Sequence, residues 1–421
     1  MIKTIQLIPG VTLRCCAAAR FKQSSLSFAL VRPMAKEEAA LNALIPAVLL
    51  RGTKHYPDLR SITQHLDDLY GAAVGTQVRR VGDYQTTGLH CAFLEDRFAL
   101  NGDQVMAPMV DFLRQLLLEP VTENGGFSAS FLESEKKNLI ATIESELNDK
   151  RAYAMNRMLR SMCRADAYGI PRLGEAEDVA AIDPVTAYNH YQKLLRESRI
   201  DIFYVGSAPA ETVAQLMRQL LAGIDRNYVN LPEQTGFHDA GGSDFSECLD
   251  VAQGKLCIGY TTPITNRSPE FVAMQLANTI FGAGMTSKLF VNVREKLSLC
   301  YAIGSAYYGA KGIVTVSAGI DFDKEQLTRD QIQAQLTAIQ NGDITDDELT
   351  AAKEAILSSL RGTYDSPGAI ESYYATTALS GMGMSVEEYM AVLPTVTKDQ
   401  VAAAARTVKP HTSFFLKGAD A

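Results

Sequence analysis

A weak internal repeat limits the possible folds of this chain more than any other feature. When the sequence is shifted by about 231 residues, Phe28–Ala43 aligns with Gly259–Met274. Both stretches contain the end of a strand-like segment, a proline-containing turn and the start of a helical run. The same shift aligns His65–Tyr70 with Lys296–Tyr301. The 421 residues are therefore expected to use one ground plan twice, and not to form two or three unrelated domains.

Composition marks the boundary between the two halves. The segment Asn227–Ser246 has little periodicity and is rich in Gly, Asn, Asp, Pro and Ser, which is typical of a linker. We therefore predict an N-terminal domain over residues 1–226, a linker over 227–246 and a C-terminal domain over 247–421.

Both halves contain two kinds of hydrophobic pattern. Stretches such as Ser25–Pro33 and Gly88–Asp96 alternate with a period of two, as expected of half-buried strands. In Ser130–Met162 and Thr345–Thr363 the apolar residues recur every three or four positions, which indicates long amphipathic helices. Because strands and helices occur in mixed order, each half is predicted to be α+β, with a mixed or antiparallel sheet covered by helices on one side.

Charge and hydropathy exclude several classes of partner. The net charge is -8 and the basic residues are scattered, which argues against nucleic-acid binding. The longest apolar run, Ala43–Leu50, is far shorter than the ~20 residues that span a bilayer. The N-terminus lacks the apolar core of a secretory signal. The seven cysteines are an odd number without a C-x-x-C pair, which fits reduced thiols in a cytoplasm better than a disulfide framework or a structural zinc site. We therefore expect a cytoplasmic protein without membrane or nucleic-acid partners.

Few residues have the spacing of a known catalytic or metal site. The six histidines are His55, His65, His90, His190, His238 and His411. None of them lies three or four residues from another, as a helical metal site would require. No G-x-S-x-G elbow supports a serine nucleophile, and Phe281–Lys288 lacks the glycine spacing of a Walker loop. The remaining block, Gly284–Tyr301, contains Arg294 and Tyr301, which taken alone are typical of a solvated helix and a buried strand.

The stretch Gly282–Ser305 resembles the C-terminal half of pitrilysin/insulinase-family zinc peptidases. In that family an Arg and a Tyr in the pattern R-E-x-x-x-L-x-Y contact the backbone of the peptide substrate. The matching residues here are Arg294 and Tyr301. The resemblance covers nearly the whole chain, including the duplication, and is nearest to the bacterial branch associated with elongation-factor-P modification. It implies that each chain of this kind forms one half of a clamshell.

The same resemblance shows where a zinc site has been lost. The family carries His-x-x-Glu-His on a helix shortly before a Lys/Arg-Gly-Thr turn, which is Arg51–Thr53 here. The positions of the first His, the catalytic Glu, the second His and the distal Glu ligand are occupied by Ala43, Pro46, Ala47 and Thr142. Pro46 would also remove a helix hydrogen bond and disturb the i, i+4 geometry of two ligands. The resemblance therefore implies no metal in this chain and no general base for activating water.

An intact Arg/Tyr pair without a metal site matches family members that divide the chemistry between two chains. The resemblance then implies a subunit that is inactive alone and belongs to a heterodimeric zinc metalloendopeptidase. A homologous partner with His-x-x-Glu-His would hold the zinc, and a peptide would be cut inside a closed chamber. Two alternatives remain open: a catalytically inert scaffold of the same fold, and a homologue that binds peptides without cutting them.

Overall fold

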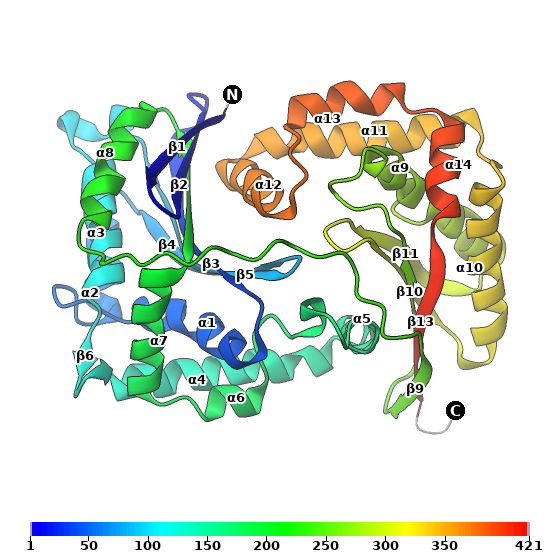
Figure 1. The fold of residues 1–421 in the computed structure, drawn as a ribbon, viewed down its shortest axis with the longest axis horizontal. Helices are drawn as coiled ribbons and strands as arrows, with labels where there is room; N and C mark the ends of the chain where they lie inside the picture. Colours follow the sequence, from blue (N-terminus) through cyan, green and yellow to red (C-terminus); the bar gives the residue numbers. More distant parts are fainter. Residues whose placement is uncertain (1, 419–421) are drawn as a thin grey trace. The chain divides into compact units, whose positions relative to one another are not determined.

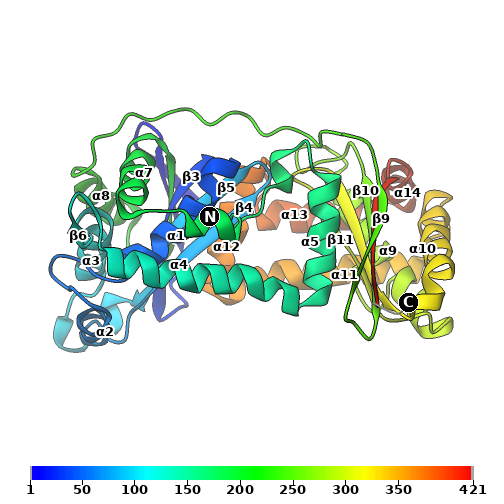
Figure 2. The ribbon, with the colours of Figure 1, turned by 90° about the horizontal axis from the view of Figure 1, so that it is seen from below.

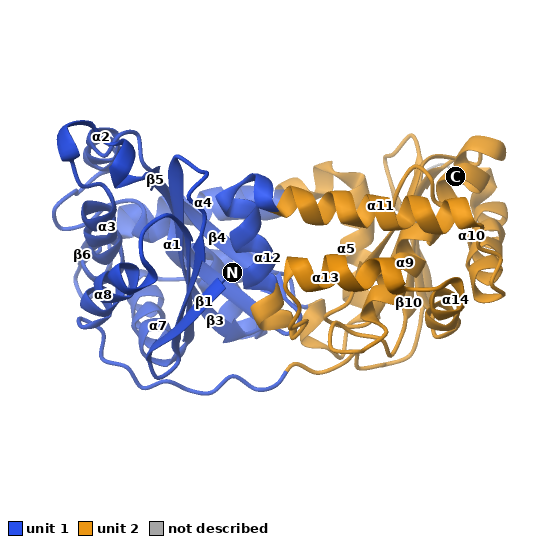
Figure 3. Cartoon of the chain, turned by 90° about the horizontal axis from the view of Figure 1, so that it is seen from above, with its two compact units in different colours: residues 1–144, 170–233, 364–376 blue, residues 145–169, 234–363, 377–421 orange. Residues whose placement is uncertain are grey.

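The computed structural model describes residues 2–418, which fold into two compact units (Figure 3). Unit 1 comprises Met1–Glu144, Ile170–Glu233 and Tyr364–Thr376, and unit 2 comprises Ser145–Gly169, Gln234–Thr363 and Thr377–Ala421. Each unit thus contains one segment from the other half of the sequence. The domain boundaries predicted at residues 226 and 247 refer to the repeat in the sequence and not to these compact units. They stay a prediction.

Unit 1 is built on a six-stranded mixed sheet in the order β1-β2-β8-β3-β5-β4. Its strands are β1 (Ile2–Ile8), β2 (Val11–Ala17), β3 (Gln23–Pro33), β4 (Ala73–Val81), β5 (Tyr84–Leu94) and β8 (Arg199–Gly206). The β2–β8 pair is parallel and the other pairs are antiparallel. A short hairpin, β6 (Thr122–Glu123) and β7 (Gly126–Phe127), lies outside this sheet. Because β4 is the last strand in this order, it forms one edge of the six-stranded sheet.

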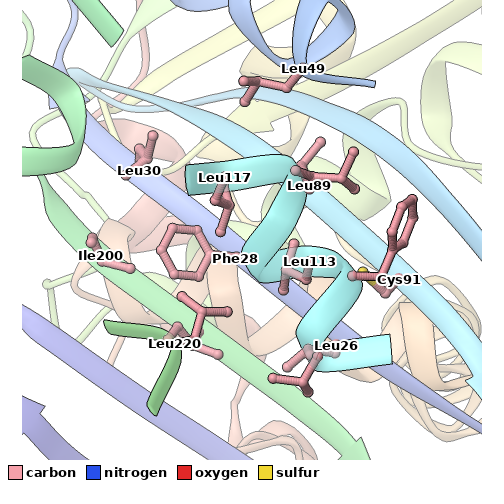
Figure 4. Packing of buried hydrophobic residues seen from close by; sticks show 14 of the residues in the cluster. Leu26, Phe28, Leu30, Leu49, Leu89, Cys91, Leu113, Leu117, Ile200 and Leu220 are labelled. Atoms are coloured by element: carbon pink, nitrogen blue, oxygen red, sulfur yellow. The ribbon is translucent and has the colours of Figure 1, made fainter. Parts of the chain in front are cut away.

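Helices cover one face of this sheet and bury its apolar residues. They are α1 (Lys36–Leu49), α2 (Leu59–Asp68), α3 (Met106–Leu118), α4 (Ala129–Glu144), α6 (Ala176–Ala180), α7 (Pro184–Glu197) and α8 (Ala210–Leu221). Figure 4 shows Leu26 and Phe28 of β3 packed against Leu113 and Leu117 of α3. Alternate residues of each strand point into this core, which is why the period-two pattern predicted these strands.

Unit 2 contains a five-stranded mixed sheet in the order β11-β12-β10-β13-β9. Its strands are β9 (Asp244–Leu249), β10 (Gly254–Thr261), β11 (Cys300–Tyr308), β12 (Ile313–Ile320) and β13 (Lys409–Gly418). Its helices are α5 (Lys150–Met162), α9 (Phe271–Phe281), a π-helix (Leu289–Lys296), α10 (Glu325–Gln340), α11 (Asp346–Gly362), α13 (Val386–Val392) and α14 (Lys398–Arg406). Between α8 and β9, the described chain forms no helix or strand (Figure 2).

The two sheets repeat one topology. The order β2-β8-β3-β5-β4 in unit 1 corresponds strand by strand to β9-β13-β10-β12-β11 in unit 2. The parallel pair recurs as well, because β9 runs parallel to β13 as β2 does to β8. The predicted α+β class, with a mixed sheet covered by helices in each half, is confirmed. Among the described residues, no helix combines the length and apolar character needed to cross a membrane.

Each sheet also receives one helix on its second face, which the sequence pattern did not predict. Helix α5 follows α4 after a turn at Ser145–Asn148 and begins where the Asp149 carboxylate accepts two backbone N–H groups. Its residues Met158 and Met162 pack against the unit 2 sheet, opposite α9 and α10 (Figures 1 and 2). The expected helical pattern over Ser130–Met162 therefore belongs to two helices in different units.

Helix α12 (Pro367–Ser380) belongs to unit 1 as far as Thr376, and this part of it occupies the equivalent place in unit 1 (Figure 1). Ile370 packs there against Cys16 and Val205 on the face opposite the main core. The neighbouring Glu371 is buried and accepts hydrogen bonds from Ser27 and from the guanidinium of Arg79 on β4. These contacts fix both α12 and the edge strand of the sheet.

Candidate functional site

Arg294 lies on an unusual helix that holds its side chain at the surface of unit 2. The helix, Leu289–Lys296, is a π-helix, a rare form that is often found at functional sites. Leu289 and Val293 anchor it and are fully buried. Arg294 follows Val293, and its guanidinium lies over the Phe290 ring at 4.6 Å from the centroid, with its side chain 38% exposed. Its Nε lies 3.7 Å from Oε1 of Glu295, so the helix presents a partly exposed cation beside one carboxylate.

Polar contacts support this helix, beginning with its N-cap residue Lys288. Lys288 is buried and its Nζ lies 2.8 Å from Oε1 of Glu348. The same Glu348 closes a capping box with Thr345 at the start of α11. Asn292 donates to Gln335 of α10 at 2.7 Å. These contacts tie the π-helix to two neighbouring helices, and sequence reasoning assigned none of them a role.

Tyr301 is the extra residue of a β-bulge. In the β11–β12 ladder Cys300 pairs with Ile320 and Ala302 pairs with Gly319, so Tyr301 has no partner across the strands. A bulge redirects the side chain of its extra residue and is common next to active sites. Tyr301 is accordingly 67% exposed, and its hydroxyl lies 3.5 Å from Oδ1 of Asp321. The reading of Tyr301 as a buried strand residue is wrong.

A tight turn joins the two residues. Ser298 has a φ of 50° and reverses the chain between the π-helix and β11. Its N–H donates to the carbonyl of Arg294 at 3.1 Å, and the Leu299 N–H donates to Val293 at the same distance. Arg294 and Tyr301 therefore lie on one short segment whose backbone is fixed by these hydrogen bonds. A guanidinium and a phenol can both donate to a peptide carbonyl oxygen, including one that gains negative charge.

Three of the four positions at which metal ligands are predicted to be missing line one pocket in unit 1. Ala43 and Ala47 of α1 and Thr142 of α4 line a cavity of about 500 Å³, whereas Pro46 is not part of its wall. The Thr142 hydroxyl donates to the carbonyl of Asn138 at 2.8 Å. No group of three or more His, Cys, Asp or Glu side chains that could hold a metal occurs among the described residues. The residues present do not fit a zinc ion, which requires about four nitrogen, sulfur or oxygen ligands.

Known proteins that are similar to this chain include ones named as inactive peptidases. The family model described as "Peptidase M16 inactive domain" matches residues 183–356. A relative from Bacillus subtilis named "Probable inactive metalloprotease YmfF" is 28% identical and covers 98% of this chain and 96% of its own length. The chain is therefore similar to M16 peptidases, and over residues 183–356 it matches their family model. The family resemblance predicted from the block around Arg294 and Tyr301 is confirmed.

Solved structures extend the similarity to the fold of the chain. A conserved protein from Enterococcus faecalis superimposes with a TM-score of 0.92 at 27% identity, covering 99% of this chain and 98% of that one. The peptidase M16 inactive domain from Pseudomonas fluorescens gives a TM-score of 0.83 at 17% identity, with coverage of 99% and 98%. A Rickettsia felis relative named "Uncharacterized zinc protease" is 23% identical and covers 68% of this chain and 69% of itself.

Helix α1 continues through Pro46. Proline lacks the N–H that would donate to the carbonyl of Asn42, four residues earlier. The Thr87 hydroxyl of β5 donates to that carbonyl instead. The Asn42 side chain also bonds His190 and Gln85, each at 2.8 Å. Burial lowers the pKa of His190 to about 4, so the imidazole in this network is neutral near pH 7.

We expect the substitution Thr87→Val to destabilise the chain because Pro46 cannot donate a hydrogen bond in place of the lost hydroxyl. It would leave the buried Asn42 carbonyl without a donor and lower the free energy of unfolding by about 1–3 kcal/mol. In a Pro46→Ala background the helix regains its own N–H, so the same substitution should cost less. Urea unfolding of the four variants measures the difference. Thr86→Val, on the opposite face of β5, is the matched control, and an equal cost of Thr87→Val in both backgrounds would contradict this account.

Proposed function

We propose that this chain is the non-metal-binding subunit of a heterodimeric cytoplasmic zinc metallopeptidase. A homologous partner with a His-x-x-Glu-His motif would hold the zinc, and Arg294 and Tyr301 of this chain would bind the substrate backbone inside a closed chamber. The observation that carries the proposal is an asymmetry between the units. Unit 2 presents an exposed Arg/Tyr pair on a supported π-helix and bulge, whereas unit 1 has no ligands at its metal positions.

The division of labour follows from the chemistry of peptide hydrolysis. In such a complex the partner's zinc ion would supply a Lewis acid and an activated water molecule. The residues of this chain would orient the peptide by donating to a backbone carbonyl. They would act on the substrate as hydrogen-bond donors, and the proton transfers of hydrolysis would be carried out by groups of the partner chain.

Co-expression with a His-x-x-Glu-His homologue from the same genome tests this proposal. We expect the two chains to co-elute, with about one zinc per heterodimer and hydrolysis of a quenched fluorescent, unstructured peptide. This chain purified alone should contain no zinc and cut nothing. Zinc in the isolated chain, or activity without the partner, would contradict the proposal. Failure of every such homologue to associate would favour an inert scaffold.

A further inference from the structure

The pocket beside the emptied metal positions lies at the open edge of the unit 1 sheet. Residues 76–79 of β4 form one wall, and α1, α4 and the loop at Arg172 form the others. Strand β4 pairs with β5 on one side, and no strand of the described residues pairs with its other side. Arg172 Nη1 donates to the carbonyl of Val78 at 2.8 Å. The guanidinium therefore lies at the edge strand, where an extended peptide would find unpaired backbone groups.

The acidic groups at this pocket are already paired. Glu135 lies in the wall, and its Oε1 is 2.9 Å from Nε of Arg51. Its other oxygen accepts from Asn138 at 3.2 Å. Arg79, also in the wall, is bound through both terminal nitrogens to Glu371 at 3.2 and 2.9 Å. Neither carboxylate is therefore available to neutralise a further cation.

Arg172 is that further cation. Within residues 2–418 it contacts no carboxylate, and its described hydrogen bond goes to the Val78 carbonyl. Burial and the positive charge of Arg80 lower the pKa of Arg172, although a guanidinium remains protonated at neutral pH. The pocket wall thus carries one positive charge in excess, and the free donors of Arg172 match the geometry of a carboxylate.

Gln77 provides a second, independent sign of a ligand. Its side chain lines the pocket and is only 8% exposed, and its Oε1 is buried without a hydrogen-bond partner among the described residues. A buried amide oxygen without a donor costs free energy, which a ligand N–H would recover. A ligand that satisfies both Arg172 and Gln77 needs an anionic group and N–H donors. An extended peptide that carries a carboxylate has both.

We propose that this pocket binds a peptide carboxylate through Arg172, at the place where the family's metal ligands are missing. Two sources of carboxylate fit this chemistry: the C-terminus of a peptide and an Asp or Glu side chain within it. The small side chains of Ala43 and Ala47 leave space for such a group. The site needs neither zinc nor a partner chain, so it goes beyond the proposed function, and its failure would leave the role of Arg294 and Tyr301 untouched.

Fluorescence anisotropy with three labelled probes tests the carboxylate site on the full chain. The probes are the octapeptide Ser-Val-Thr-Ala-Ser-Val-Thr-Ala with a free C-terminus, its C-terminal amide, and an amide with Glu at the fifth position. We expect the free acid, the Glu peptide or both to bind about tenfold more tightly than the neutral amide. The probe that binds identifies the source of the carboxylate. Equal affinity for all three probes, or no binding of any, would overturn the proposal.

Two variants separate the charge from the shape of the pocket. Arg172→Gln should remove the preference for the carboxylate, whereas Arg218→Gln, an exposed arginine on α8, is the matched control and should keep it. Ala47→Leu fills the pocket and should weaken all three probes about equally. Thermal unfolding checks that each variant folds. A carboxylate preference that survives Arg172→Gln in a folded chain would overturn the assignment of Arg172.

Discussion

Replacement of Arg294 by Ala together with Tyr301 by Phe is expected to lower kcat/KM of the proposed heterodimer by about a hundredfold to a thousandfold. The reason is that removal of one donor to a developing oxyanion costs about that much. The single variants should each lose part of this rate, and their effects need not add, since both donors would serve one carbonyl. Steady-state hydrolysis of a quenched fluorescent peptide by the co-purified complex measures the loss.

The design of this experiment benefits from the exposure of both side chains. Arg294 is 38% exposed and Tyr301 is 67% exposed, so their substitution should change the free energy of unfolding by no more than about 0.5 kcal/mol. The zinc content and the elution volume of the complex should not change. Lys296→Ala, an exposed cation on the same π-helix, is the matched control. An intact complex that keeps nearly full activity without Arg294 and Tyr301 would remove them from the active site.

The repeated topology could be predicted from the sequence because it depends on local patterns that occur twice. Strands such as β3 and β10 carry their own period-two signal, and the shift between the halves aligns them. The sequence did not predict against which sheet α5 and α12 would pack. An amphipathic pattern shows that a helix buries one face, but it does not show which sheet accepts that face. That choice depends on contacts between residues far apart in the sequence, such as Met158 with Cys257.

The candidate site was likewise predictable only in part. The motif around Arg294 and Tyr301 has a fixed spacing. Counting from Arg51–Thr53 and from Glu135 gives the positions at which metal ligands are predicted to be missing, and these positions stay a prediction. The bulge that exposes Tyr301 depends on its pairing with β12, which no local pattern reveals. Arg172 and Gln77 come from a loop and an edge strand and form no motif. Only the folded chain shows that they share one pocket.

The buried pair of Asp166 and Lys311 should make a large contribution to the stability of unit 2. Both side chains are 0% exposed, and Lys311 Nζ lies 2.9 Å from Oδ2 of Asp166 and 3.1 Å from the carbonyl of Thr235. Asp166 belongs to the segment Ser145–Gly169, which comes from the first half of the sequence, whereas Lys311 joins β11 to β12. Thr235 belongs to the connecting segment. The ion pair and the hydrogen bond from Lys311 to Thr235 together join three distant parts of the chain.

We expect Asp166→Ala to lower the free energy of unfolding by about 3–5 kcal/mol, because it leaves the Lys311 ammonium buried without this carboxylate. The double variant Asp166→Ala, Lys311→Met should recover much of the loss, since no unpaired charge then remains. Urea unfolding followed by circular dichroism measures both. The exposed pair of Lys324 and Asp321, at 2.6 Å, is the control, and its disruption by Lys324→Met should cost less than about 1 kcal/mol. If Asp166→Ala cost no more than this control, the segment Ser145–Gly169 would be held to unit 2 by the apolar contacts of α5, and the ion pair would contribute little.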